Sequence, residues 1–205
     1  GKKIGVFSKG STNEYFVDVE LKRAGLKPTD VNLVELNAGN QAAAFANKAI
    51  DVAQGAEPTA TVYADRGLAV KWLPASDIAP NFQYTFLLFS QKFADQKTDL
   101  AMRFMVAYLR GTRDWQQMLD SGKDKDQIFS YVSKYTPLKD RALFDRTGQP
   151  VLPPNPRIDK ESIRKQEDWA KERGLVSQEP PVDKIVDTRF IDAAMQKLGP
   201  YQSKK

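Results

Sequence analysis

The residues in this sequence that could act chemically are polar side chains placed directly after apolar, strand-like segments. The run Ser8-Lys9-Gly10-Ser11-Thr12 follows the β-prone segment KKIGVF and precedes a helical pattern. Such a turn offers backbone N–H groups, hydroxyl donors and the positive end of a helix dipole, which together stabilise a carboxylate, sulfonate or phosphate. We therefore predict that Ser8, Gly10, Ser11 and Thr12 bind an anionic group. The alternative is that Ser11 and Thr12 only cap the helix, with Lys9 a solvated surface side chain.

Polar side chains also stand at or near the ends of the next two strand-like segments. Asn37 and Asn40 follow VNLVEL, and Gln54 lies within DVAQGA. Ligands of open α/β sheets bind outside the carboxyl ends of the strands, so we predict that all three residues contact a ligand. The alternatives are that the Asn37–Asn40 segment is only a turn with a helix cap, and that Gln54 lies at the surface or bonds to the backbone.

Glu57, Phe82 and Tyr84 complete the set of predicted ligand-binding residues. Glu57 precedes Pro58 at the start of a predicted helix. Its carboxylate either binds a cationic or hydroxyl group of the ligand or stabilises the helix N-terminus. Phe82 and Tyr84 flank the first residue of the segment QYTFLLF. We predict that they line the ligand cleft, and the alternative is that they pack in the core.

The composition excludes several kinds of catalysis. The chain has no Cys and no His, so it lacks a Cys or His nucleophile, a zinc site built from these residues, and histidine acid/base chemistry. The closely spaced carboxylates, Asp95 with Asp99 and Glu167 with Asp168, fall on predicted helix surfaces or caps, which are poor positions for acid/base catalysis. We therefore predict no catalytic residue, no cofactor, no metal site and no enzymatic activity.

The charge and hydropathy of the chain exclude further classes. Lysine and arginine (31) exceed aspartate and glutamate (26) only modestly, and no basic run is interleaved with aromatic residues. We therefore predict no nucleic-acid partner. No apolar run approaches the ~18 residues of a membrane span, and no signal peptide is visible. If the protein is exported, the signal was removed or lies upstream of residue 1.

The elements that must position these residues alternate between strands and helices in the first part of the chain. Strands are predicted over 3–7, 31–36 and 50–56, and two more over 68–73 and 83–89. The helix after the first strand begins with a capping-box pattern, Ser11 with Glu14, and stops at Gly25. Further helices are predicted over 41–48 and 58–65. Strands and helices in this order predict right-handed crossovers and a parallel sheet, hence an α/β fold.

The remainder of the chain, from about residue 96, is predicted to be mostly helical. One long amphipathic helix ends near residue 119, and its apolar residues at helical spacing are Leu100, Phe104, Ala107, Tyr108 and Trp115. Shorter helices are predicted over 128–135, 160–173 and 188–198, the second capped by Asp159. The proline-rich segment 148–156 is predicted to be an extended surface loop. Trp115 and Trp169 are predicted to be packing residues.

Four segments resemble the periplasmic substrate-binding proteins of ABC importers for nitrate, sulfonate, taurine and thiamine-pyrimidine precursors. GKKIGVFSKGSTNEYF is similar to the opening of that family's second lobe, and AFANKAIDVAQGAEP to its helix-strand-EP segment. FMVAYLRGTRDW resembles its long helix after the crossover, and VDTRFIDAAMQKLG its C-terminal helix. Many members carry Trp immediately before the Glu of the EP pair, whereas this sequence has Ala56. The difference removes a stacking surface and implies a roomier pocket.

The resemblance implies a type II periplasmic-binding-protein-like α/β fold, in which two lobes close around a ligand. Residues 1–78 would form the second, ligand-binding lobe, with α/β layers, and residues 79–205 would supply a crossover strand and the C-terminal helices of the first lobe. The family's first lobe begins upstream of the segments matched here, so the chain is expected to lack about the N-terminal third. The strand QYTFLLF would then lack sheet neighbours, which predicts association through exposed apolar surface.

The resemblance also implies a function. The protein would be a periplasmic or otherwise extracytoplasmic, membrane-associated receptor that captures a small, anionic organic molecule, such as a sulfonate, a carboxylate or a pyrimidine-like compound, and delivers it to an ABC permease. One alternative is the ligand-sensing effector domain of a transcription regulator, although no helix-turn-helix precedes it here. An enzymatic relative that makes the thiamine pyrimidine uses its own His and Cys, which this sequence lacks.

Overall fold

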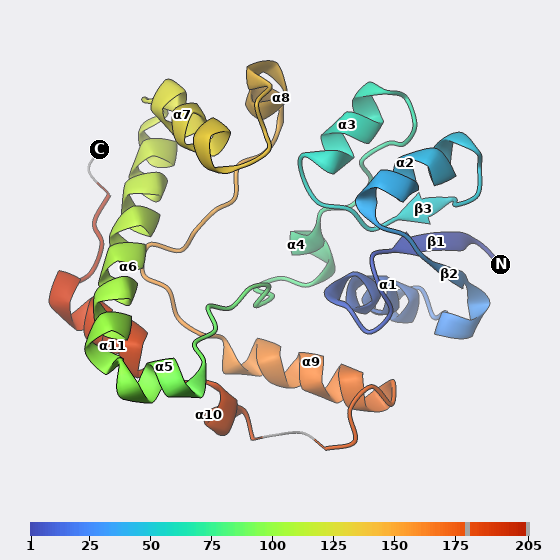
Figure 1. Ribbon diagram of the computed structural model, residues 1–205. Coiled ribbons are helices and arrows are strands. Elements are labelled where there is room, and N and C mark those ends of the chain that lie inside the picture. The colour runs from blue at the N-terminus through green and yellow to red at the C-terminus, as the bar shows by residue number, and fades with distance from the viewer. Residues whose placement is uncertain (179–180, 204–205) are drawn as a thin grey trace. The chain divides into compact units, whose positions relative to one another are not determined.

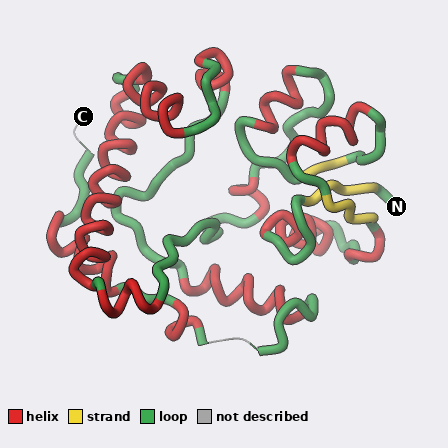
Figure 2. Tube along the Cα trace, viewed as in Figure 1, coloured by secondary structure: helices red, strands yellow, loops and turns green. Residues whose placement is uncertain are grey.

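The computed structural model describes residues 1–178 and 181–203, which group into two compact units (Figures 1 and 2). The first unit contains Gly1–Tyr84, Asp145–Thr147 and residues 159–178, and the second contains Thr85–Phe144, Gly148–Ile158 and residues 181–203. All strand residues of the described chain lie in the first unit, where they are yellow in Figure 2. The predicted division at residue 78 placed residues 159–178 with the second half of the chain, whereas here they group with residues 1–84. The position of the lobe boundary therefore stays a prediction.

The first unit is built on a three-stranded parallel sheet with the strand order β2-β1-β3. The strands are β1 (Lys3–Val6), β2 (Asn32–Glu35) and β3 (Val52–Ala53). Ile4 and Val6 of the central strand are buried, as expected for a strand covered on both faces. The predicted parallel α/β sheet is confirmed, although its strands are shorter than the sequence pattern indicated.

Helices cover both faces of this sheet, which makes three layers. The helix α1 (Thr12–Arg23) lies on one face, and α2 (Ala38–Ala46) and α3 (Thr59–Asp65) lie on the other (Figure 1). This follows from the strand order, because the right-handed crossovers from β1 to β2 and from β2 to β3 run in opposite directions along the sheet. A short 3-10 turn (Pro28–Asp30) and α4 (Ala75–Ile78) complete the connections.

The C-terminus of α1 ends where the sequence predicted. Gly25 has a φ of 70°, a conformation that disfavours side chains. Its N–H donates to the Lys22 carbonyl (3.1 Å), and the Leu26 N–H donates to the Leu21 carbonyl (2.8 Å). These are the two hydrogen bonds of a Schellman motif, so the predicted glycine stop is confirmed.

A buried charged cluster joins α9 (Lys160–Glu172) to α1. Glu14 and Asp18 of α1 are 2% and 1% exposed, and both carboxylates pair with the Arg173 guanidinium that follows α9. The Trp169 indole N–H donates to Asp18 Oδ2 at 2.9 Å, and the Trp169 and Tyr15 rings pack edge to face. Asp159 caps α9 by accepting the Ser162 N–H at 3.0 Å, as predicted. Trp169 is therefore a packing residue, as predicted, that also holds a buried carboxylate.

Two predicted strands are wrong. Residues 68–73 and 83–89 form no strand in the described structure. Apolar, β-prone composition makes a strand only where a neighbour supplies ladder hydrogen bonds. Gln83 instead bonds to α9, because its N–H donates to Ser162 Oγ (2.8 Å) and its carbonyl accepts from Gln166 Nε2 (3.1 Å).

The second unit is helical, and its core lies between α6 and α11. Its helices are α5 (Gln91–Gln96), α6 (Thr98–Ser121), α7 (Lys125–Tyr135), α10 (Val182–Ile185) and α11 (Arg189–Leu198), while α8 (Arg141–Arg146) begins in this unit. The long helix that the sequence predicted is confirmed as α6. Its buried residues against α11 are Ala101, Met105 and Leu109, together with Phe190 and Ala194 of α11. The small side chains at Ala101 and Ala194, both fully buried, permit a close approach of the two helices.

The apolar stripe predicted for α6 is not its buried face. Leu100, Phe104 and Tyr108 are 46%, 47% and 39% exposed in the described structure. Because consecutive helical residues differ by about 100° in direction, the stripe lies roughly a quarter turn away from the residues that contact α11. The helix therefore carries two apolar faces, of which one is covered.

Two side chains of α6 hold the proline-rich loop 148–156. The Trp115 indole N–H donates to the Pro150 carbonyl at 3.0 Å, in keeping with its predicted packing role. Arg113 donates to the carbonyls of Pro154 (3.0 Å) and Gly199 (2.6 Å). These bonds tie the loop and the end of α11 to one helix. Over the described residues, no helix combines the length and apolar character that crossing a bilayer requires.

We predict that Arg173→Ala destabilises the protein by about 3 kcal/mol, because it leaves the buried carboxylates of Glu14 and Asp18 without their cation. Urea unfolding followed by far-UV circular dichroism measures the difference. Arg164→Ala on the same helix is the matched control, since Arg164 is 53% exposed and lies 4.0 Å from its acidic neighbour. Equal midpoints for the two variants would contradict a structural role for the cluster.

Candidate ligand-binding site

The strand order gives the described sheet a topological switch point between β1 and β3, the kind of position where ligands of open α/β sheets bind. The chain leaves β1 toward β2 on one side, and the next crossover brings β3 to the other side of β1. The connections after β1 and β3 therefore diverge, which opens a crevice at the carboxyl ends of these two strands. The predicted residues from Ser8 to Thr12 follow β1, and Gln54 follows β3. The topology thus brings these two predicted groups to one crevice.

The N-terminus of α1, which faces this crevice, has no side-chain cap. Ser11 is the N-cap residue in extended conformation, but its hydroxyl donates to the Ser8 carbonyl at 2.5 Å. Glu14 accepts the Gly10 N–H at 2.7 Å and pairs with Arg173. The predicted capping box is therefore wrong, because the buried cluster with α9 holds the Glu14 carboxylate away from Ser11. The Lys9 N–H also donates to a carboxylate, that of Glu35, at 2.5 Å. An anion at this end would therefore meet the dipole and the N–H groups of the first turn of α1, and not those of Lys9 and Gly10.

Gly10 shapes the turn between β1 and α1. Its φ is +72°, and a Cβ atom there would lie 3.3 Å from Leu175 Cδ2. A side chain at this position would strain the backbone and press on the residue that follows α9. Glycine therefore suits this position, because the turn passes close to Leu175, just after the end of α9.

Gln54 is joined to α1 by a residue that sequence reasoning missed. The Asn13 side-chain amide donates to Gln54 Oε1, and the Gln54 backbone N–H donates to the Gly5 carbonyl at 3.1 Å. Neither side chain is fully buried. Asn13 directly follows the predicted run of residues 8–12. It is the second residue of α1, so it also lies near the carboxyl end of β1, and its position in the sequence could have identified it. The Asn13–Gln54 bond joins the start of α1 to the residue that follows β3, at the carboxyl ends of β1 and β3.

Glu57 stabilises the start of α3 and pairs with a lysine. Its carboxylate accepts the Thr61 N–H (3.1 Å) and hydroxyl (2.7 Å), and Lys71 Nζ lies 2.6 Å from it. Burial raises the pKa of the Glu57 carboxyl, but the hydrogen bonds from Lys71 and Thr61 outweigh this effect, so its pKa lies below the ordinary 4.5. These contacts match the helix-stabilising alternative. Lys71 had no local sequence signal, since its partner lies 14 residues away.

Asn37 and Asn40 form a cap on the outer side of the sheet. Asn37 is the N-cap of α2, and its Oδ1 accepts the Asn40 N–H at 3.0 Å. Both residues are exposed and follow β2, which lies on the far side of β1 from β3. The turn-and-cap alternative accounts for their contacts, and a ligand role for them stays a prediction.

Phe82 and Tyr84 pack against α1. The Phe82 ring lies 4.9 Å from the Phe16 ring and 5.1 Å from the Tyr15 ring, measured between centroids. The Tyr84 and Phe16 rings are stacked at 6.3 Å. The core-packing alternative describes these contacts, although Tyr84 is 52% exposed. Contact between either ring and a ligand stays a prediction.

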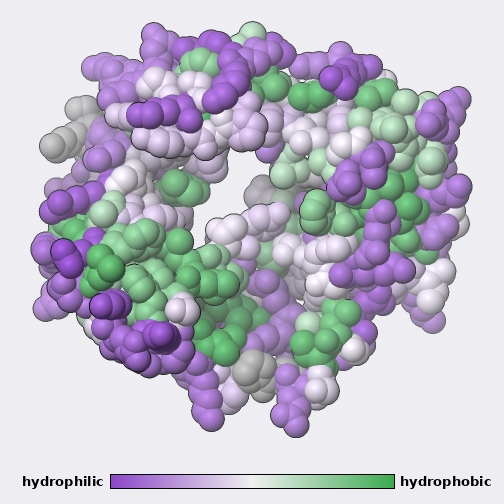
Figure 3. All heavy atoms as spheres, in the orientation of Figure 1, coloured by the Kyte–Doolittle hydropathy of each residue, from purple (hydrophilic) through white to green (hydrophobic). Residues whose placement is uncertain are grey.

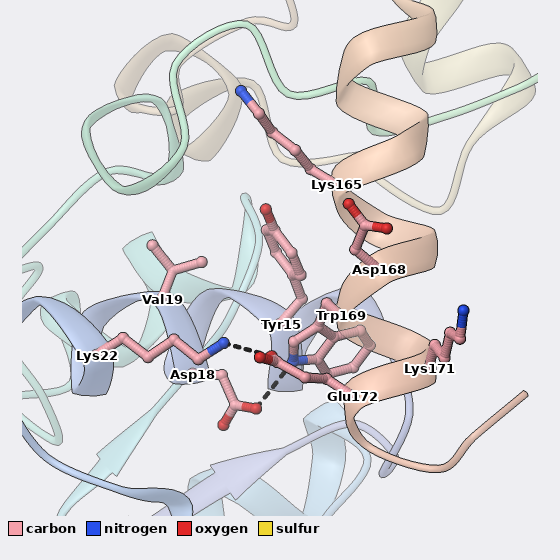
Figure 4. A pocket seen from close by; sticks show the side chains of 9 residues that line it. All are labelled: Tyr15, Asp18, Val19, Lys22, Lys165, Asp168, Trp169, Lys171 and Glu172. Atoms are coloured by element: carbon pink, nitrogen blue, oxygen red, sulfur yellow. Dashed lines mark hydrogen bonds and ion pairs between the residues drawn. The ribbon is translucent and has the colours of Figure 1, made fainter.

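A second hollow lies between α1 and α9, outside the predicted site (Figure 4). It encloses about 650 Å³ and is lined by side chains of both charges, among them Lys22, Lys165, Asp168 and Glu172. Figure 4 shows that the Lys22–Glu172 ion pair, at 2.6 Å, and the Trp169–Asp18 hydrogen bond span it. None of the predicted residues lines it. Two of its charged side chains, Lys22 and Glu172, pair across it, and Asp18 pairs with Arg173, so we assign it to the packing of α9 on α1.

No metal site is found in the part of the chain that the structure describes, since no group of three or more acidic side chains is suitably placed. The polar groups near the carboxyl ends of β1 and β3 are amides, hydroxyls, the start of the α1 dipole and the Lys71–Glu57 pair, all of which suit hydrogen bonding to a small ligand.

We predict that Glu57→Gln lowers the free energy of unfolding most above pH 4.5, the ordinary pKa of a Glu carboxyl. Because the folded-state pKa is depressed, the stabilisation is present above the unfolded value and is lost as pH falls through the folded one. Solvent screening of the Lys71 pair limits the effect to about 1 kcal/mol. Urea unfolding at several pH values measures it, with the exposed Glu161→Gln as the charge control. A Glu57→Gln deficit that does not change with pH would contradict the ion pair.

Comparisons with known proteins agree with this architecture. The model of the family described as NMT1/THI5 like matches residues 1–118. The ligand-binding component of an ABC-type import system from Staphylococcus aureus, solved with zinc bound, has a TM-score of 0.72 at 17% identity and matches 94% of this chain. The putative periplasmic sulfonate-binding protein SsuA from Methylobacillus flagellatus KT has a TM-score of 0.69 at 20% identity over 100% of this chain. The periplasmic aliphatic sulphonate binding protein SsuA from Escherichia coli has a TM-score of 0.66 at 20% identity over 93%.

The chain spans about 63% of the Staphylococcus aureus and Escherichia coli structures and 64% of the Methylobacillus flagellatus structure. No curated protein matches the sequence. The structural likeness confirms the predicted fold class, that of periplasmic binding proteins, for the part of the fold that the chain covers. Because the family model spans more than half of the sequence, the chain belongs to the NMT1/THI5-like family.

Proposed function

We propose that the protein is the solute-binding component of an ABC importer and that it captures a small organic anion at the crevice between β1 and β3. The uncapped N-terminus of α1 at this crevice is the observation that carries the proposal. Membership of the family supports it, as does the likeness to binding components of import systems. Two of the similar structures are named as sulfonate-binding proteins, which makes a sulfonate the first ligand to test.

The helix dipole is the feature of this end of the sheet that supports an anion as the ligand. The helix dipole of α1 places partial positive charge at its first turn, which is worth about 0.3–2 kcal/mol to an anion. Three carboxylates lie nearby: Glu35 accepts the Lys9 N–H at 2.5 Å, Glu14 accepts the Gly10 N–H at 2.7 Å and pairs with Arg173, and Glu57 pairs with Lys71. The ligand anion would therefore bind at the first turn of α1 itself, beyond Gly10. The hydroxyl of Thr12 and the amides of Asn13 and Gln54 would add hydrogen bonds. A sulfonate, a carboxylate or a pyrimidine-like compound offers acceptors that suit these donors.

The proposed mechanism is transport without catalysis. The ligand would differentially stabilise a form in which two lobes close about a hinge, and the closed protein would dock on a membrane permease. Catalysis is not part of the proposal, because the sequence has no Cys or His and the buried carboxylates of α1 bond to Arg173 and Trp169. We propose a periplasmic or otherwise extracytoplasmic location, in keeping with the similar proteins named periplasmic. The regulator alternative has no support among the similar structures named above.

We predict that anions perturb the backbone amides of residues 10–13 in an NMR titration of the ¹⁵N-labelled protein. Methanesulfonate, nitrate, an aromatic carboxylate and a pyrimidine carboxylate form the test panel, and tetramethylammonium chloride is the cation control. Because the chain spans only part of the similar proteins, we expect a dissociation constant of about 1 mM, or about −4 kcal/mol. Small, non-saturating shifts spread over exposed lysines would contradict an anion site at α1.

We further predict that Gln54→Ala weakens binding of the best anion about tenfold, since it removes a hydrogen-bonding group and the anchor of Asn13. The same titration gives the dissociation constants. Gln96→Ala, on the exposed end of α5, is the matched control. If the two variants bind the anion equally, Gln54 does not face the ligand.

A further inference from the structure

The sequence contains a capping box that the folded protein does not use. Ser11 and Glu14 have the spacing at which a glutamate carboxylate accepts the N–H of the N-cap residue. In the structure, Glu14 accepts the N–H of Gly10 instead, at 2.7 Å. Over the described residues, the Ser11 N–H has no hydrogen-bond acceptor. The Glu14 carboxylate therefore has two alternative donors on consecutive residues, of which it uses one.

Arg173 holds the Glu14 carboxylate at the Gly10 donor. Its Nη2 donates to Glu14 Oε1, while the Gly10 N–H bonds to Oε2, so each carboxylate oxygen has its own donor. Arg173 Nε also lies 3.4 Å from Asp18 Oδ2. Without the guanidinium, Glu14 and Asp18 would be two buried like charges one helical turn apart. Loss of Arg173 would therefore drive the Glu14 carboxylate toward the remaining donor, the Ser11 N–H.

The end of α9 contacts the turn before α1 at two points. α9 ends in a Schellman motif at Gly174, whose φ is 67°. Arg173 pairs with Glu14, and Leu175 Cδ2 lies 3.3 Å from where a Cβ atom on Gly10 would be. The Arg173 side chain is 32% exposed and Leu175 is 46% exposed, and Figure 3 shows hydrophobic surface where the chain leaves α9. This end of α9 can therefore separate from the turn by local opening, without unfolding of the whole unit.

We propose that Arg173 is a positioning residue for the anion-binding end of α1, and that Glu14 closes the capping box on Ser11 when the end of α9 leaves the turn. In the closed form, the Glu14 carboxylate is an internal anion at the first turn of α1 and competes with a ligand anion. Because such coupling is reciprocal, a bound anion favours the form in which Arg173 holds Glu14. The competition rests on the function proposed above, whereas the closure of the capping box is measured without a ligand, so the two can fail separately.

The first test follows the Ser11 amide by NMR and hydrogen exchange, with no ligand present. In ¹⁵N-labelled Arg173→Gln, we expect this amide to exchange about fivefold more slowly than in the wild type, the effect of a cap hydrogen bond worth about 1 kcal/mol. In Glu14→Ala/Arg173→Gln, the rate should return to the wild-type value. Arg164→Gln, at an exposed position on the same helix, is the matched control and should leave the rate unchanged.

The direction of this change separates the proposal from a purely structural role. A variant that only lost stability would exchange its amides faster, because opening becomes more frequent. Slower exchange at Ser11 in Arg173→Gln therefore requires a new acceptor for its N–H. Equal Ser11 rates in Arg173→Gln with and without Glu14→Ala would overturn the proposal.

Asp18→Asn keeps the comparison possible if Arg173→Gln does not fold. It removes the second buried carboxylate, and the asparagine oxygen can still accept the Trp169 indole N–H, which donates to Asp18 Oδ2 at 2.9 Å. Added to both variants, it leaves Glu14 as the one acidic partner of residue 173 that the comparison changes. The same difference at Ser11 is expected, and its absence would overturn the proposal in this background too.

The second test is a thermodynamic cycle for the binding of methanesulfonate. Glu14→Ala removes a negative charge near the anion in any background, so only the difference between backgrounds is diagnostic. We expect the gain in affinity from Glu14→Ala to be about fivefold larger in Arg173→Gln than in the wild type, because only there does the carboxylate occupy the first turn. Equal gains in both backgrounds would overturn the competition. If the wild type binds no anion at residues 11–13 while the Ser11 amide responds as expected, the proposed function is wrong and the internal cap stands.

Discussion

The buried interaction of Glu14 and Asp18 with Arg173 is the constraint on which the first unit depends. It joins residues about 155 positions apart in the sequence and holds α9 on α1. It also determines the chemistry at the start of α1. Because Arg173 and the Gly10 N–H occupy the Glu14 carboxylate, the capping box that the local sequence favours does not form. A structural ion pair thus leaves a helix N-terminus uncapped at the crevice where the topology favours ligand binding. The packing of α9 on α1 and the state of the α1 N-terminus therefore depend on the same side chain, Glu14.

The sequence predicted the elements whose signals are local. The alternation of apolar segments with helical patterns predicted the parallel sheet, and Gly25 and Asp159 marked a helix end and a helix start that the structure confirms. Where the outcome depends on a distant partner, the predictions fail. The segment 83–89 has the composition of a strand, but Gln83 bonds to α9 and no ladder partner lies in the described chain. The apolar stripe of α6 was identified correctly as a stripe, yet α11 packs on a neighbouring face because two alanines allow a closer approach.

In the candidate site, too, local signals predicted where residues lie, but not which partners they bond to. Position after a strand was enough to predict that Ser8 to Thr12 and Gln54 lie at one edge of the sheet, because parallel strands bring their carboxyl ends together. It could not say what each side chain bonds to. Glu57 has Lys71 as a partner, Asn37 caps α2, and Phe82 packs on Phe16. Asn13 and Lys71 were missed because neither follows a predicted strand directly, and their partners, Gln54 and Glu57, lie 41 and 14 residues away in the sequence.

The residue before Glu57 bears on how such a site would select its ligand. The resemblance noted in the sequence places Trp there in many relatives, whereas this chain has Ala56, preceded by Gly55, around which the space is open. Without an aromatic face, the crevice cannot select a ligand by stacking at this position. Selection would then depend on directional groups, namely the amides of α1 and the side chains of Asn13 and Gln54. Such donors discriminate by the number and geometry of acceptor oxygens, which differ between a tetrahedral sulfonate and a planar carboxylate. In the proposed site, alanine at residue 56 would therefore shift specificity from the shape of the ligand's apolar part to the geometry of its charged group.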